Sequence, residues 1–238
     1  MEIQVLFDKY AVEPRFTIGW GVSFLINKTV LFDTGEKGDM LLHNMDEMGV
    51  DVKRIEAVVI SHDHWDHTGG LWDLLKRNPS LNVYACPGFD SAFKERVRGC
   101  GAKLLPAERF TEIADRVFVS GEIVGTYKEA SISEQALAIK HETGLTILTG
   151  CAHPGIGRMI RETAGHFPDT PLALVAGGFH LMQESRGTIE RVVEEFRELG
   201  VRKVGPTHCS GDDAAEIFKQ RYGADFMPII VGDRIMSD

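Results

Sequence analysis

The feature that most constrains this chain is a run of six residues that holds three imidazoles and one well-placed carboxylate: His62, His64, Asp66 and His67, with Gly69 just beyond. In an extended loop, side chains two residues apart project to the same side, so His62 and His64 can bind one metal ion from one direction. His67 is an odd number of residues from both, so in an extended chain its side chain would point to the opposite side. If the backbone turns into a helix near Gly69, Asp66 and His67 swing toward a second point nearby, as two-metal hydrolytic sites require.

Three further histidines lie in short glycine- or proline-rich segments, each directly after an apolar run that is typical of a strand: His153, His180 and His208. Loops that follow strands at one edge of an α/β structure converge in space, and ligands and catalytic groups collect there. We therefore expect these three side chains near the HxHxDH loop. The remaining histidines have no companion ligands, and we expect ordinary surface or core positions for them: His43, His141 and His166.

The HxHxDH motif, the segment 31–35 before it, and the later His153 and His208 resemble the metallo-β-lactamase superfamily over nearly the whole chain. Further segments resemble one branch of it, the metal-dependent hydrolases grouped with dihydropterin-(ribofuranosyl)aminobenzene 5'-phosphate synthase. Branch membership does not fix the substrate. The segments that carry this second resemblance are 118–123, 134–137, 148–156, 177–181 and 207–211.

Short strand-like runs alternate with amphipathic helical patterns, which favours two sheets packed face to face with helices outside. The clearest helix runs from Thr188 to Leu199, with Gly200 as its stop, and a second begins beyond Ser210 and ends before Gly223. The resemblance implies the specific fold: an αββα sandwich of the metallo-β-lactamase type, with two mixed β-sheets flanked by helices. The strand-like runs are 3–7, 22–26, 30–32, 57–60, 83–85, 117–119, 136–139, 145–148, 172–175 and 201–204.

Length and charge narrow the possible functions. At 238 residues the chain is in the range of one large α/β domain, so we expect a single domain over 1–238, with its two halves meeting near 121–131. The formal net charge of −9, and basic runs of two residues at most, disfavour nucleic acid and acidic membrane as partners. The sequence has no apolar stretch long enough to span a bilayer and no signal peptide, so we expect a cytoplasmic protein.

The four cysteines show no CxxC pairing, so we expect no disulfide framework. Cys151 lies two residues before His153, and Cys209 directly follows His208. We expect both to be small buried residues that pack beneath the site. Direct contact with a metal stays open as the alternative, because cysteine binds zinc and iron well.

The resemblance implies two groups of metal ligands, one of His62, His64 and His153, the other of Asp66, His67 and His208. They would hold one or two divalent ions, with zinc expected and iron or manganese as alternatives. Many superfamily members add an aspartate that bridges both ions, whereas segment 176–180 has no acid. The second ion can therefore be held by the remaining ligands, be weakly bound, or use His180.

A divalent ion with three protein ligands keeps positions free for water and substrate, and it lowers the pKa of the water to about 7. We expect Asp66 to orient or deprotonate the nucleophile, and His180 to hydrogen-bond the substrate phosphate or the attacking water. Pro154 is predicted to be the first residue of a helix whose free N–H groups face the site, and Gly211 to precede another such helix. We expect an exposed surface position for Arg158, with a role in clamping an anion as the alternative.

These observations predict a metal-dependent hydrolase that acts on a small, anionic, phosphate- or diphosphate-bearing molecule through metal-activated water. The alternative is a transferase of the synthase type, which would displace diphosphate from a pterin methyl group with an arylamine ribose phosphate. A non-catalytic metal-binding or redox-sensing protein is the second alternative. The sequence does not predict the oligomeric state.

Overall fold

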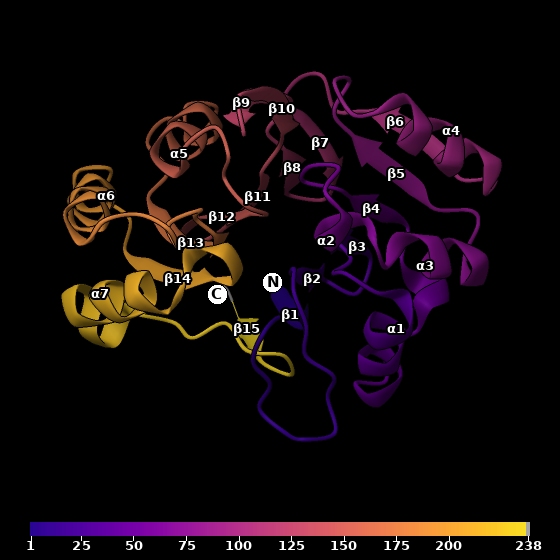
Figure 1. Cartoon of the computed structure of the whole chain (residues 1–238), viewed down its shortest axis with the longest axis horizontal. Helices are drawn as coiled ribbons and strands as arrows, with labels where there is room; N and C mark the ends of the chain where they lie inside the picture. The colour runs from indigo at the N-terminus through magenta and orange to yellow at the C-terminus, as the bar shows by residue number, and fades with distance from the viewer. Residues whose placement is uncertain (237–238) are drawn as a thin grey trace.

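A computed structural model describes residues 1–236 and shows two mixed β-sheets packed face to face, with helices on both outer faces (Figure 1). This confirms the predicted αββα sandwich. The first sheet has the order β15 (Arg234–Met236), β1 (Glu2–Phe7), β2 (Ser23–Ile26), β3 (Val30–Phe32), β4 (Ala57–Val59), β5 (Asn82–Ala85) and β6 (Lys103–Pro106). The second has the order β14 (Lys203–Thr207), β13 (Leu172–Gly178), β12 (Gly144–Thr149), β11 (Leu137–His141), β8 (Val117–Val119) and β7 (Thr111–Ala114).

Alternate side chains of each strand enter different hydrophobic cores, because successive residues of a strand point to opposite faces. In β2, Phe24 and Ile26 pack between the sheets, whereas Leu25 packs under the outer helices. In β11, Leu137 and Ile139 face the first sheet and the residue between them faces outward. Both faces of these strands are therefore buried, which explains why they are almost continuously apolar.

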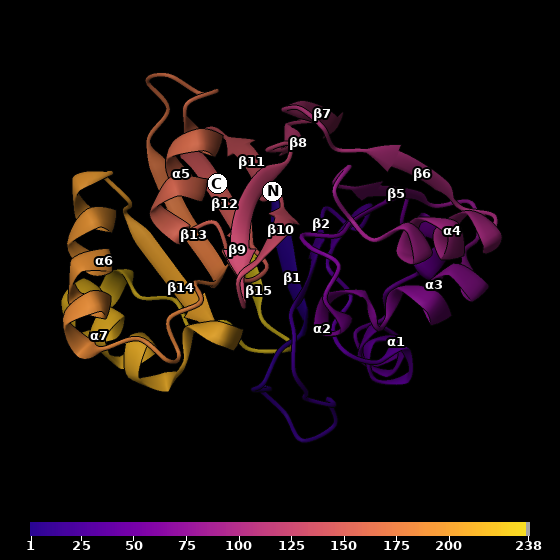
Figure 2. The ribbon, with the colours of Figure 1, turned by 45° about the horizontal axis from the view of Figure 1, so that its top comes forward.

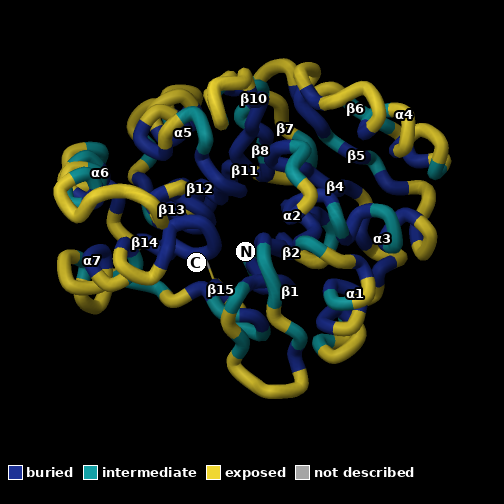
Figure 3. Tube along the Cα trace, in the orientation of Figure 1, coloured by how far each residue is buried: buried dark blue, intermediate teal, exposed yellow. Residues whose placement is uncertain are grey.

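Each sheet carries its own layer of helices on the outside (Figure 2). The outward faces of the helices are exposed, whereas the strands beneath them are largely buried (Figure 3). Within residues 1–236, no helix combines the length and apolar character needed to cross a lipid bilayer. The first layer contains α1 (Gly38–Glu47), α3 (Leu71–Arg77) and α4 (Ser91–Gly99), and the second contains α5 (Ile156–Ala164), α6 (Arg186–Glu198) and α7 (Asp212–Tyr222). The short helical segments are α2 (Trp65–Thr68), η1 (Val52–Arg54), η2 (His208–Ser210) and η3 (Gly223–Asp225).

The two helices that the sequence predicts most clearly are present. Helix α6 begins after Ser185, whose side chain accepts a hydrogen bond from the Thr188 N–H, and Gly200 adopts a positive φ of 75° just beyond its end. Helix α7 follows Gly211 and ends at Gly223. Both ends use glycine where an L side chain would be strained.

The predicted boundary between the two halves was wrong. Along the chain, β6 of the first sheet is followed by β7 of the second, so the crossover between sheets lies at residues 107–110, and β15 later returns to the first sheet. Segment 121–131 instead contributes to a separate hairpin of β9 (Ile123–Tyr127) and β10 (Ala130–Glu134). Strands β6, β7 and β9 escaped the sequence analysis because many of their residues are partly or fully exposed, so they lack a continuous apolar run.

Replacement of Phe24 by alanine should lower the free energy of unfolding by about 3–5 kcal/mol, because the ring is fully buried between the sheets and its removal leaves a cavity. Ile18, whose side chain is 49% exposed, provides the matched control, and Ile18→Ala should change that free energy by less than about 0.5 kcal/mol. Urea unfolding followed by circular dichroism measures both. Equal effects of the two substitutions would contradict the inter-sheet core.

Candidate metal centre

The predicted ligands lie at the carboxyl ends of parallel strands, where ligands collect in open α/β sheets. The HxHxDH loop follows β4, which pairs in parallel with β3 and β5. The segments that carry His153, His180 and His208 follow β12, β13 and β14, which are parallel to one another. Helix α2 begins at Trp65, directly after His64 and earlier than predicted, and the ligand atoms of Asp66 and His67, which lie in this helix, belong to a different group from those of His62 and His64.

The first group contains His62, His64 and His153, whose ligand atoms all lie within 4.8 Å of one another. His62 Nε2 is 3.1 Å from His64 Nδ1, and the ring centroids of His62 and His153 are 4.8 Å apart. Burial, reinforced by the neighbouring histidines, lowers the pKa of His62 well below its usual value and that of His153 to about 3. Both rings are therefore neutral at pH 7, which is the form that binds a metal ion.

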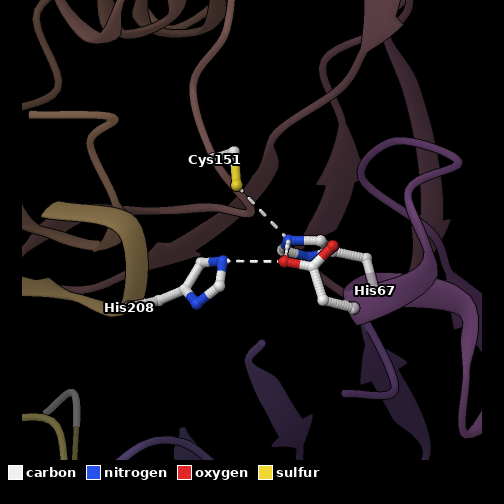
Figure 4. A group of neighbouring side chains, drawn as sticks. His67, Cys151 and His208 are labelled. Atoms are coloured by element: carbon white, nitrogen blue, oxygen red, sulfur yellow. Dashed lines mark hydrogen bonds and ion pairs between the residues drawn. The ribbon is translucent and has the colours of Figure 1, made fainter. Parts of the chain in front are cut away.

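The second group contains Asp66, His67 and His208, as predicted, together with Cys151. Asp66 Oδ2 lies 3.2 Å from His208 Nε2 and 3.5 Å from His67 Nε2. Figure 4 shows the side chains of His67, Cys151 and His208 converging from three separate segments. Burial alone would raise the pKa of Asp66, but the contacts with His208 and His67 outweigh it and lower that pKa to about 2. The carboxyl is therefore ionised at neutral pH.

Ring nitrogens in these groups are suited to bind a cation. Both nitrogens of His153 are buried and have no hydrogen-bond partner within residues 1–236, whereas Nε2 of His208 contacts the Asp66 carboxylate at 3.2 Å. A buried polar atom without a partner lowers the stability of the folded protein by about 1–3 kcal/mol. A bound ligand at such an atom would remove this cost. Imidazole and carboxylate donors at these separations suit zinc, iron or manganese.

Asp33 orients two of the histidines, a role that the sequence analysis did not assign. Its carboxylate accepts hydrogen bonds of 2.7 Å each from Ser61 N, Ser61 Oγ and His67 Nδ1. Because the Ser61 hydroxyl gives its one proton to Asp33, His62 Nδ1 must donate to Ser61 Oγ, 2.9 Å away. Nε2 of His62 therefore carries the lone pair that a bound ion requires, 3.1 Å from His64 Nδ1, and Nε2 of His67 faces Asp66. Burial would lower the pKa of His67, but the Asp33 charge and hydrogen bond raise it to about 9.

Glu134 organises the loop that carries His153. Its fully buried carboxylate accepts hydrogen bonds from the N–H groups of three successive residues, Cys151 (2.9 Å), Ala152 (2.8 Å) and His153 (2.7 Å). Burial outweighs these hydrogen bonds and raises the pKa of Glu134 to about 7. The role of Glu134 is not evident from the sequence, because nothing in a single sequence shows which backbone groups a buried acid will contact.

The predicted anion site beside Pro154 was wrong. Helix α5 begins at Ile156, and Gly155 precedes it with a φ of 94°, which turns the chain before the helix starts. The N–H groups next to His153 are bound by Glu134 instead of facing an anion. Arg158 donates to Glu162 Oε1 and to the carbonyl oxygen of Val124. Its side chain is 48% exposed, as expected for a surface residue.

Gly211 precedes α7 as predicted, but the first turn of that helix carries Asp212 and Asp213. Asp212 also pairs with Lys9, 2.5 Å away. Two carboxylates already neutralise the positive end of the helix dipole, so this end does not favour an anion.

His180 lies at the wall of the site and outside both predicted ligand groups. Its ring centroid is 4.4 Å from that of His153, and its ligand atom lies within 4.8 Å of those of His153 and Cys151. The other three histidines belong to none of the metal-competent groups in residues 1–236. His43 contacts the Arg15 carbonyl, His141 is buried beside Thr146, and His166 stacks on Phe110.

A cavity of about 670 Å³ opens onto both ligand groups, which is within the range of small-molecule sites. Aromatic and apolar side chains form much of its rim, and Trp65 and Met182 are 61% and 52% exposed. Among the described residues that line it, Lys128 is the one lysine or arginine. The lining includes Trp20, His64, Trp65, Asp66, Tyr127, Lys128, Cys151, His153, His180, Met182 and His208.

Comparison with known proteins identifies the family. The sequence model of the metallo-beta-lactamase superfamily matches residues 21–171. A 7,8-dihydropterin-6-methyl-4-(beta-D-ribofuranosyl)-aminobenzene-5'-phosphate synthase from Methanocaldococcus jannaschii is 28% identical, over 98% of this chain and 95% of the relative. The crystal structure of Tm1679, a metal-dependent hydrolase of the beta-lactamase superfamily, is 30% identical, with a TM-score of 0.83 over 100% of this chain and 99% of the other.

The fold is shared more widely than the sequence. The metallo-beta-lactamase fold protein YhfI from Bacillus subtilis is 15% identical, yet its TM-score is 0.71 over 99% of each chain. The sequence match, the sheet order and the positions of the histidines agree with one another. This chain belongs to the metallo-beta-lactamase superfamily.

Proposed function

We propose that this protein is a metal-dependent hydrolase of a small phosphate- or diphosphate-bearing molecule. The observation that carries the proposal is the pair of adjacent ligand groups beside one cavity, together with the two buried His153 nitrogens that have no hydrogen-bond partner in residues 1–236. In this proposal His62, His64 and His153 hold one divalent ion, and Asp66, His67 and His208 hold a second. Zinc is the expected ion, with iron or manganese as alternatives.

The ions would supply positive charge that polarises a phosphoryl oxygen and activates water. The chain's own residues position the reactants around that charge. Asp66 is ionised and its side chain is buried beside the cavity, so it can orient the nucleophile and accept its proton. His180 and Lys128 line the cavity, where each can hydrogen-bond a phosphate oxygen.

A second candidate function is the transfer reaction in which an arylamine ribose phosphate displaces diphosphate from a pterin methyl group. Two observations favour it: the extent of the similarity to the Methanocaldococcus synthase, and the aromatic side chains around the cavity. Trp20, Trp65 and Tyr127 offer flat apolar faces against which a pterin or an aminobenzene ring can stack. Release of diphosphate from a pterin diphosphate only when the arylamine is present would favour this reaction over hydrolysis.

His62→Ala should abolish turnover of a chromogenic phosphodiester by the metal-loaded protein, because the ring is buried in the first ligand group. The matched control is His166→Ala, which removes an exposed histidine that stacks on Phe110, and its rate should equal that of the wild type. Absorbance of the released phenolate measures both rates. Metal binding without turnover of any phosphoester or pterin diphosphate would favour the non-catalytic alternative, a metal-binding or redox-sensing protein.

Asp33→Asn should weaken zinc binding by about 10- to 100-fold, the usual cost of removing a group that orients a metal ligand. Asp33 now accepts hydrogen bonds from Ser61 and His67. The N–H groups of an asparagine amide would face at least one of these donors, and that hydrogen bond would be lost. Competition with a chromophoric chelator measures the affinity. Asp46→Asn, which alters an exposed carboxylate paired with Arg77, is the control, and an unchanged affinity in Asp33→Asn would refute the orienting role.

His180→Ala should retain the metal content of the wild type and lower kcat by on the order of 100-fold, because the side chain is assigned to the substrate phosphate. Elemental analysis and steady-state kinetics on the same preparation separate the two quantities. Loss of an ion would instead make His180 a ligand. A variant unchanged in both quantities would return it to a structural role.

A further inference from the structure

Cys151 is the residue that connects the predicted ligand groups. Its Sγ lies within 4.8 Å of the ligand atoms of Asp66, His67 and His208, and also within 4.8 Å of those of His153 and His180. Sγ is 3.4 Å from His67 Nε2, and the side chain points at that ring (Figure 4). Within residues 1–236, no other cysteine belongs to a group of residues able to hold a metal ion.

The surroundings of the thiol point independently to a ligand. His153, which shares one group with Cys151, has two buried ring nitrogens without a hydrogen-bond partner among the described residues, and His208, which shares the other, is 1% exposed with its Nε2 3.2 Å from Asp66 Oδ2. The backbone of Cys151 is fixed, because Glu134 accepts a hydrogen bond from its N–H. Buried thiol, buried imidazole and ionised carboxylate therefore meet at one point that the protein holds rigidly.

We propose that Cys151 Sγ is a metal ligand and that it links the two ligand groups in place of the acid that segment 176–180 lacks. The inference rests on the proposed metal centre and adds a sulfur donor to it. A bound divalent ion would displace the thiol proton, and the resulting thiolate is a soft donor. The site should therefore prefer Zn²⁺, Co²⁺ or Fe²⁺ over Mn²⁺ and Mg²⁺, whose usual ligands are oxygen atoms.

The experiment is a Co²⁺ titration of the full-length protein, because a thiolate bound to Co²⁺ gives a charge-transfer band in the near ultraviolet that imidazole and carboxylate do not give. Wild type, Cys151→Ser and Cys209→Ser are compared, with circular dichroism to check folding. Cys209 is the matched control: it is also a buried thiol, it follows a proposed ligand directly, and its Sγ contacts the Cys151 carbonyl oxygen at 3.6 Å. Competition between zinc and manganese is measured on the same three proteins.

We expect the band in the wild type and in Cys209→Ser, and its loss in Cys151→Ser. The preference for zinc over manganese should fall at least about 10-fold in Cys151→Ser, the lower end of what altering a metal site costs. If Cys151→Ser does not fold, the spectra of the other two proteins still decide: a band in both supports the proposal. Binding of Co²⁺ by the wild type without the band would overturn the assignment of Cys151 and leave the metal centre standing. No binding of any divalent ion would overturn both.

Discussion

The rest of the site depends on the hydrogen bonds that the Asp33 carboxylate accepts from Ser61 and His67. Asp33 follows β3, and parallel pairing with β4 brings it beside Ser61, since the Asp33 N–H donates to the Val59 carbonyl oxygen at 2.9 Å. Through Ser61 it fixes the proton of His62, and directly it fixes that of His67. One buried acid thus determines which nitrogen is available in each of the two ligand groups. The register between β3 and β4 therefore determines which histidine nitrogens can bind an ion.

The second sheet contributes in the same way, through Glu134 at the end of β10. This acid holds three successive N–H groups of the loop that follows β12, and so it positions both His153 and Cys151. The ligands therefore come from loops above both sheets of the sandwich. Because the sheets share one apolar core, displacement of either sheet would separate the two halves of the ligand set. The rigidity of the centre follows from the packing beneath it.

Much of the site could be predicted because its information is local. The spacing within the HxHxDH loop predicts that His62 and His64 share one point and that Asp66 and His67 share another. Each later histidine follows a recognisable strand. Asp33 and Glu134 could not receive roles, because their partners lie 28 and 17 residues away in the chain and depend on strand register. The element pattern predicted the sandwich and its central strands, whereas exposed edges such as β6 and β7 lack the apolar signal. The start of α5 was misplaced because Gly155 turns the chain away after Pro154.

The place of Cys151 follows from the glycines of β13. Gly177 and Gly178 lie in close contact with neighbouring backbone: a Cβ at Gly177 would lie 2.1 Å from the Thr149 carbonyl oxygen, and one at Gly178 would lie 2.2 Å from that of Gly150. No side chain, and hence no bridging acid, fits at either position while β12 and β13 pack this closely. The same close approach brings the loop after β12 over the end of β13, where Cys151 lies between the ligand groups. The absence of an acid and the central position of the thiol are thus two consequences of one strand contact.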